Sequence, residues 1–85
     1  MSSARITVYS RPGCHLCEEA VAELQPLAAA AQTGIAEVDI DQDDALLLAH
    51  LERIPVVLVD GCEICTLFVE AEAVRTALAS EPAGR

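Results

Sequence analysis

The sequence contains no lysine and no tryptophan, and it has only one tyrosine and one phenylalanine. Its 14 Asp and Glu residues against 5 Lys and Arg residues give a formal net charge of −9 at pH 7. Contacts to phosphate need lysine or arginine, so this balance argues against nucleic acid and against an anionic membrane surface as partners. Because aromatic side chains are so few, a packed core has to be built from Val, Ile, Leu and Ala.

Long apolar runs are also missing. No stretch approaches the roughly 18 apolar residues of a membrane span, and residues 1–5 lack the apolar region of a signal peptide. We therefore expect a cytoplasmic protein in a reducing compartment. There, 4 cysteines in 85 residues indicate catalysis or metal binding rather than a structural disulfide framework. The length fits one domain over residues 1–85, which we expect to be a monomer.

The apolar pattern of the chain predicts an α/β fold. Strands are expected over residues 6–10, 35–40, 56–59 and 62–68. Helices are expected over residues 14–31, 43–52 and 70–80, with a frayed tail over 81–85. The order is βαβ-α-ββα, and a right-handed crossover makes the first two strands a parallel pair. Asp60-Gly61 predicts a hairpin turn into an antiparallel edge strand.

Local signals refine the helices. Pro26 should kink the first helix or end it early, because proline lacks the N–H that the helix needs. Gly34 is a plausible cap for the end of that helix. Residues 41–44 offer capping oxygens and negative charge to the second helix. The second helix is expected to bury Leu47, Leu48 and Leu51.

The most informative stretch is Cys14-His15-Leu16-Cys17, at the junction of the first strand and the first helix. This cysteine spacing in a βαβ unit is typical of thioredoxin-like redox motifs, although zinc knuckles share it. Cys14 should lie at the helix N-terminus, where the macrodipole favours a thiolate, with Arg11 and His15 as candidate cations nearby. Cys17 falls on the apolar stripe of the helix. We therefore predict a nucleophile at Cys14 and a shielded resolving thiol at Cys17.

Residues 62–65 repeat the same cysteine spacing, which raises the question of a zinc or iron–sulfur site. The strand that begins at Pro55 starts near Cys14 and runs away from it. The hairpin should then lie roughly 15 Å away, too far for one metal to be shared by all four cysteines. Positions three apart in a strand face opposite sides, so one of Cys62 and Cys65 should be semi-buried and the other exposed. A local disulfide or metal role is the alternative for this pair.

Residues 9–17 (YSRPGCHLC) and residues 53–56 (RIPV) together resemble the small bacterial glutaredoxin-like proteins of the thioredoxin superfamily. The resemblance covers nearly the whole chain. It implies a thioredoxin-like (glutaredoxin-type) fold with a four-stranded mixed sheet and three helices. It also implies that the Ile54–Pro55 peptide bond is cis and lies beside the cysteine pair. Ile54 would then pair with the substrate backbone, and Arg53 would lie near the active site.

The same resemblance implies a thiol–disulfide oxidoreductase. Its substrates would be disulfide-containing proteins or glutathione mixed disulfides, and its reductant glutathione or a thioredoxin-reductase-like enzyme. Glutathione would be a co-substrate, and no tightly bound cofactor or metal is expected. Cys14 and Cys17 would be catalytic. The substrate-binding residues would be Arg11, His15, Arg53, Ile54 and Pro55.

The chain departs from glutaredoxins at residues 69–72, where those proteins carry a glycine-rich turn that holds glutathione. Here the segment has no glycine and two carboxylates, which oppose an anionic ligand. A different class of function is therefore kept as the alternative. It is a thioredoxin-fold module that binds a metal or an iron–sulfur cluster without redox turnover.

Overall fold

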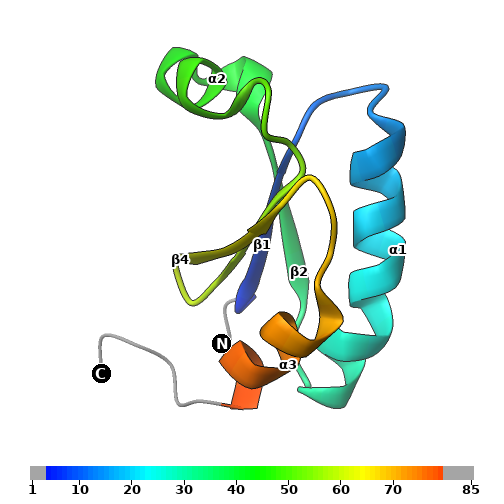
Figure 1. Cartoon of the computed structure of the whole chain (residues 1–85). Coiled ribbons are helices and arrows are strands. Elements are labelled where there is room, and N and C mark those ends of the chain that lie inside the picture. Colours follow the sequence, from blue (N-terminus) through cyan, green and yellow to red (C-terminus); the bar gives the residue numbers. More distant parts are fainter. Residues whose placement is uncertain (1–3, 80–85) are drawn as a thin grey trace.

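The computed structural model describes residues 4–79, which form one mixed four-stranded sheet and three α-helices (Figure 1). The strands are β1 (Ile6–Ser10), β2 (Ile35–Asp39), β3 (Val56–Val59) and β4 (Cys62–Thr66). The helices are α1 (His15–Ala30), α2 (Asp44–His50) and α3 (Ala71–Ala79), with a short 3-10 turn η1 (Ile40–Gln42) before α2. The predicted α/β fold and element order are confirmed. The expected tail over residues 81–85 lies outside the described residues.

The strand order across the sheet is β2-β1-β3-β4. β2 runs parallel to β1, whereas β3 and β4 each run antiparallel to the neighbour that precedes them in this order. The parallel first pair and the edge position of β4 therefore agree with the sequence-based prediction. Because β1 and β2 are parallel, their carboxyl ends meet at one edge of the sheet, the edge at which α1 begins.

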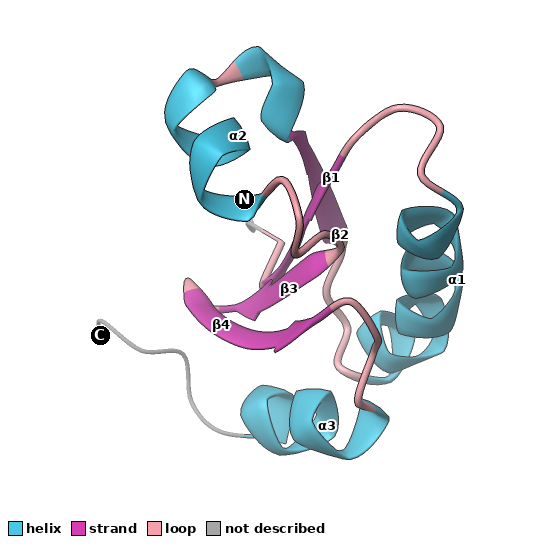
Figure 2. Cartoon of the chain, turned by 45° about the horizontal axis from the view of Figure 1, so that its top comes forward, coloured by secondary structure: helices cyan, strands magenta, loops and turns pink. Residues whose placement is uncertain are grey.

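Helices α1 and α3 cover one face of the sheet (Figures 1 and 2). Side chains alternate along β1, so that Ile6 and Val8 point into this core. The core is aliphatic, as predicted, and joins Ile6, Val8, Val57 and Val59 of the sheet to Leu24, Ala28 and Val74 of the helices. Each fully buried Val, Leu or Ile side chain contributes about 1.5–3 kcal/mol relative to exposure. No helix within residues 4–79 has the length and hydropathy of a membrane span.

Helix α2 lies at one end of the opposite face, where the His50 ring contacts the Tyr9 ring at a centroid distance of 4.9 Å. Asp43 caps this helix by accepting hydrogen bonds from two backbone N–H groups of its first turn. The predicted burial of three leucines was wrong. Leu48 is 87% exposed and Leu51 is 43% exposed, and only Leu47 is half-buried. The helix is only two turns long and packs mainly on η1, so it has no wide face to bury.

Helix α1 continues through Pro26, so the bounds predicted from the sequence hold to within one residue at each end, and of the two effects expected of this proline the early end does not occur. Pro26 is exposed, while Leu24 and Ala28 on either side of it are buried, and this packing holds the helix on the sheet despite the missing N–H. The helix ends in a Schellman motif. Gln32, not Gly34, takes the left-handed conformation there, with φ 58°. The N–H groups of Gln32 and Thr33 donate to Ala29 and Ala28 at 3.1 and 3.0 Å.

The turn between β3 and β4 has two left-handed residues, Asp60 at φ 53° and Gly61 at φ 83°. This is the type I′ geometry that Asp-Gly predicts. β4 ends at Thr66, two residues before the predicted end. Leu67 has φ 70°, and the Phe68 N–H donates to the Thr66 carbonyl at 2.7 Å, which forms a tight turn instead of continued strand.

An ion pair between Arg5 and Asp60 connects the β3–β4 turn to the residue that precedes β1. The Arg5 guanidinium donates two hydrogen bonds to the Asp60 carboxylate, at 3.1 and 2.8 Å, and a third to the Leu78 carbonyl at 3.1 Å. The hydrogen bonds from Arg5 hold the pKa of Asp60 below its ordinary value, and the positive charge adds to this effect. Burial acts in the opposite direction. The ionised carboxylate is therefore favoured by folding.

We expect the Asp60→Asn variant to unfold at a lower urea concentration than the wild type at neutral pH. Because folding lowers the pKa of Asp60, its contribution is present above the pKa of the unfolded state and is lost as pH falls through the folded pKa. The difference between the two proteins should be constant above about pH 5 and shrink below about pH 4. Asparagine tolerates the left-handed backbone at this position, so the turn itself is preserved. A difference that grows on acidification would contradict the assignment.

Candidate active site

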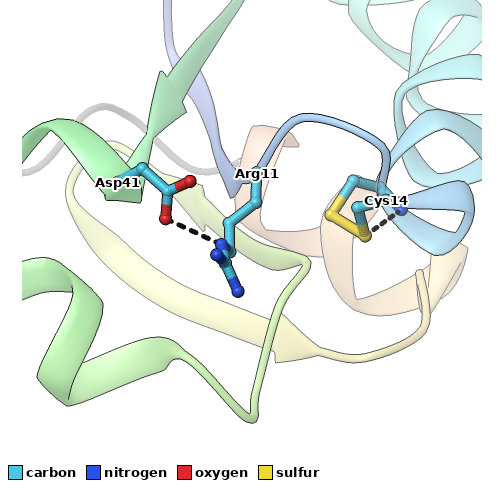
Figure 3. The surroundings of a disulfide bond; sticks show 4 residues. Arg11, Cys14 and Asp41 are labelled. Carbon is cyan, nitrogen blue, oxygen red and sulfur yellow. Dashed lines mark hydrogen bonds and ion pairs between the residues drawn. A yellow bond between two sulfur atoms is a disulfide. The ribbon is translucent and has the colours of Figure 1, made fainter.

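Cys14 and Cys17 form a disulfide where the loop after β1 enters α1 (Figure 3), with their Cα atoms 5.2 Å apart. Cys14 is the N-cap residue of α1, and its Sγ accepts a hydrogen bond from the Cys17 N–H at 3.1 Å. The turn before it is closed by the Cys14 N–H, which donates to the Arg11 carbonyl at 3.3 Å. Gly13 has φ 79°, a conformation that side chains other than glycine rarely adopt. The sequence around the pair thus builds a tight loop that ends on a helix cap.

The two sulfurs differ in accessibility. Cys14 is half-buried, whereas Cys17 is 3% exposed. Cys17 belongs to the buried stripe of α1 with Ala20, Leu24 and Ala28, which faces the sheet. A reagent from solvent can therefore approach Cys14 but not Cys17, which is the distribution that an attacking and a resolving thiol require.

The backbone N–H groups of the first turn of α1 create a positive field at Cys14, and one of them, the Cys17 N–H, donates to its sulfur. The two predicted cations are Arg11 and His15. The Arg11 Nε donates to Asp41 Oδ1 at 2.7 Å, so its charge is shared with that carboxylate (Figure 3). His15 is exposed on the first turn of α1. The helix terminus therefore supplies a fixed positive field at the sulfur.

The other predicted site residues lie at the same end of the sheet. Tyr9 pairs with Val56, which places Pro55 beside the end of β1 from which the Cys14 loop departs. The Ile54–Pro55 peptide bond is cis, and the Pro55 carbonyl accepts a hydrogen bond from the Leu67 N–H at 2.8 Å. Arg53 is exposed and forms an ion pair with Glu63 of β4. Its charge is thus partly compensated within the protein.

A cavity of about 300 Å³ adjoins the disulfide, between the first turn of α1 and the end of β2. Both cysteines line it, together with the Arg11–Gly13 loop, Ser10 and three acidic residues, Glu18, Glu37 and Asp39. Ser10, Glu37 and Asp39 were not among the site residues predicted from the sequence. The signal was present, because alternate residues at the end of a strand parallel to β1 share one face. Val8 pairs with Glu37 and Ser10 with Asp39.

Comparison of the sequence with models of known protein families identifies the family of this chain. The model of the glutaredoxin-like domain family (DUF836) matches residues 5–79. The chain belongs to this glutaredoxin-like family. A search of curated proteins finds no match to the chain.

Several solved structures are similar to this glutaredoxin-like protein. Protein Ne2328 from Nitrosomonas europaea is 29% identical, with a TM-score of 0.77, and the match covers 89% of this chain and 92% of that one. Protein XcR50 from X. campestris is 37% identical, with a TM-score of 0.67 over 91% of this chain and 99% of that one. The holo form of glutaredoxin C1 from Populus tremula x tremuloides is 20% identical, with a TM-score of 0.56 over 98% and 86%. This last match shows the fold alone.

The second cysteine pair of the glutaredoxin-like protein lies on β4. Cys62 is exposed and Cys65 is buried, and both are free thiols, as predicted. The reasoning behind that prediction was wrong, because a β-bulge places Cys62 opposite Val59 and Cys65 opposite Val57, two positions on one face. Burial raises the pKa of the Cys65 thiol, which keeps it protonated. Within residues 4–79, no three His, Cys, Asp or Glu side chains are grouped as a metal site would require.

Accessibility gives a direct prediction for the reduced glutaredoxin-like protein. Cys14 in a Cys17→Ser variant should react with iodoacetamide roughly tenfold or more faster than Cys17 in a Cys14→Ser variant. The helix terminus favours the Cys14 thiolate, and the sheet shields Cys17. Both variants should also carry Cys62→Ser, because Cys62 is exposed and would consume reagent. Mass spectrometry over time measures both rates, and equal rates or a faster Cys17 would overturn the assignment of roles.

Proposed function

We propose that this protein is a thiol–disulfide oxidoreductase that uses Cys14 and Cys17 to reduce protein disulfides or glutathione mixed disulfides. The observation that carries the proposal is the closed disulfide between a half-buried cysteine at a helix N-terminus and a buried cysteine one turn later. Membership of the glutaredoxin-like family supports the same chemistry.

The cycle begins with both cysteines reduced. The Cys14 thiolate attacks one sulfur of the substrate disulfide, the substrate S–S bond breaks, and one substrate thiolate leaves and takes up a proton. The Cys17 thiol loses its proton and attacks the Cys14 sulfur, which releases the second substrate thiol and closes the Cys14–Cys17 disulfide. Two electrons have then passed from the protein to the substrate. A thiol reductant, either glutathione or a reductase of the thioredoxin-reductase class, returns the pair to two thiols.

The remaining residues of the predicted site would position the substrate. Ile54 precedes Pro55 at the end of the sheet where the disulfide lies, and its backbone is the proposed partner of an extended substrate chain. His15 is exposed beside Cys14 and could exchange protons with a leaving thiolate. Arg11 and Arg53 are each paired with a carboxylate, so contact with an anionic substrate would have to compete with Asp41 or Glu63. We place the protein in the cytoplasm as a monomer without a tightly bound cofactor.

The proposed roles are tested by adding oxidised glutathione to the reduced protein, trapping free thiols and mapping the peptides by mass spectrometry. The wild type should end with a Cys14–Cys17 disulfide, and Cys17→Ser should stop at a glutathione adduct on Cys14. Cys14→Ser should lose all reduction of the added disulfide, because Cys17 is shielded from it.

A double variant, Cys62→Ser with Cys65→Ser, is the matched control and should behave as the wild type does. The proposal fails if Cys14→Ser still reduces the disulfide. It also fails if Cys14 and Cys17 stay free while Cys62 or Cys65 reacts, since the chemistry would then lie on β4.

A further inference from the structure

An apolar groove of about 230 Å³ lies between the first half of α1 and the turn that follows β4. Leu16, Leu67 and Phe68 line it, and these side chains are 40%, 40% and 66% exposed. The connection from β4 to α3 runs beside α1 (Figures 1 and 2). The other exposed large apolar side chains within residues 4–79, Leu48 and Leu51, belong to α2 and its C-terminal cap. Scattered apolar side chains need no explanation, whereas three around one groove indicate a binding surface.

The turn that presents two of these side chains is strained. Leu67 has φ 70°, and the Phe68 N–H donates to the Thr66 carbonyl at 2.7 Å, which is a γ-turn with positive φ, the rare form of this turn. Leucine seldom adopts this conformation because its Cβ crowds the backbone, and glycine would adopt it at lower cost. Residues held in such conformations are concentrated at ligand-binding and catalytic positions. The strain therefore indicates a role for the exposed side chains that this turn presents.

The groove adjoins the disulfide. Leu16, on the first turn of α1, lies between the two cysteines in the sequence. On the opposite wall, the Leu67 N–H donates to the Pro55 carbonyl at 2.8 Å, which ties the γ-turn to the residue after Ile54. A substrate chain that pairs with the Ile54 backbone while its cysteine bonds to Cys14 would therefore pass the groove. Successive residues of an extended chain are about 3.3 Å apart, so a residue next to the substrate cysteine would meet the apolar lining.

The charges at the groove distinguish between possible occupants. Glu19 and Glu23 line its α1 wall, and neither forms an ion pair with another residue of the 4–79 range. These carboxylates repel glutathione, which is anionic, and a second copy of this chain, whose formal net charge is −9. An apolar side chain on a neutral or basic protein segment meets no such repulsion, and its burial on Leu16 and Phe68 is favourable.

From these observations we infer that the groove lined by Leu16, Leu67 and Phe68 binds a large apolar side chain next to the disulfide cysteine of a protein substrate. The inference rests on the proposed function, and it names the substrate class of that site. In the reaction, the thiols of Cys14 and Cys17 close to a disulfide while the substrate disulfide becomes two thiols, and the apolar contact holds the substrate sulfur at Cys14. Protein disulfides with an apolar neighbour are therefore reduced in preference to oxidised glutathione.

The test uses the full chain, reduced beforehand and freed of excess reductant, in single-turnover reactions with two disulfide-linked peptides and with oxidised glutathione. The peptides differ only in the two residues beside cysteine, which are leucine or glutamine. Each rate is divided by the rate of the same disulfide with dithiothreitol, which corrects for intrinsic reactivity. The corrected rate of the leucine peptide should exceed that of the glutamine peptide and that of glutathione on the order of tenfold or more. The leucine-to-glutamine ratio should persist at about 1 M salt, because salt screens charges and not apolar burial.

Two variants and a matched control locate the effect. Phe68→Gln and Leu67→Gly should each lower the leucine-to-glutamine rate ratio several-fold, because each removes part of the apolar lining. Phe68 is mostly exposed, and glycine accepts the positive φ at residue 67, so folding should be preserved. The control, Leu48→Gln, removes an even more exposed apolar side chain from α2, outside the groove, and should keep the wild-type ratio.

The outcomes separate the two proposals. If no disulfide is reduced, the proposed function fails and the inference with it. If both peptides are reduced at equal corrected rates, or if glutathione reacts faster than the leucine peptide, the function stands and the inference is wrong. The inference is also wrong if the ratio disappears at high salt, or if Leu48→Gln lowers it as much as Phe68→Gln does.

Sedimentation of the reduced protein tests the remaining occupant, a second copy of the chain. We expect the wild type and Phe68→Gln to sediment alike, as monomers. A wild-type dimer that Phe68→Gln dissociates would show that the groove is filled by another copy, and it would overturn the inference while leaving the cysteine chemistry untouched.

Discussion

The packing of one stripe of α1 against β1 and its neighbours is the constraint on which the site depends. Cys17, Ala20, Leu24 and Ala28 follow each other at helical spacing and are all buried on the sheet. This burial fixes the rotation of the helix about its own axis, because a turned helix would expose these residues. Cys17 is thereby buried between the helix and the sheet. Cys14, one turn earlier, lies at the N-terminus of the helix and is half-buried. The difference between the two sulfurs is thus set by the hydrophobic core.

The N-terminus of α1 then supplies a positive electrostatic field at Cys14, which the apolar core cannot provide. Cys14 caps α1, and its Sγ accepts a hydrogen bond from the Cys17 N–H, so one backbone donor of this helix end points at the sulfur. In the reduced protein, this field would favour a Cys14 thiolate without a dedicated basic side chain. The Arg11 guanidinium is paired with Asp41 instead.

Much of the fold could be predicted from the sequence, because strong local patterns and global packing agree. The alternation along β1, the Asp-Gly turn and the cysteine spacing each have one dominant physical meaning. The predictions that failed concern features that tertiary contacts determine. Leu48 and Leu51 stay exposed because α2 is only two turns long, and the bulge in β4 changes which residues share a face.

The carboxylate cavity was missed for a related reason. In the sequence, the acidic residues suggest a solvated surface, since 14 of them are spread along the chain. Only the parallel register of β1 and β2 brings Glu37 and Asp39 to the cavity that Ser10 and the cysteines line. Composition predicts how much charge a surface carries, whereas topology determines where it converges.

We propose that Cys14 and Cys17 form a reversible dithiol–disulfide couple. The most direct measurement equilibrates the protein in a series of dithiothreitol redox buffers, traps free thiols and counts the labels by intact mass. We expect one two-electron transition that removes two labels, changing tenfold in ratio for about every 30 mV, with Cys62 and Cys65 still labelled throughout. The transition should vanish in Cys17→Ser. If the wild type shows no transition, or if the labels lost belong to Cys62 and Cys65, the account is contradicted.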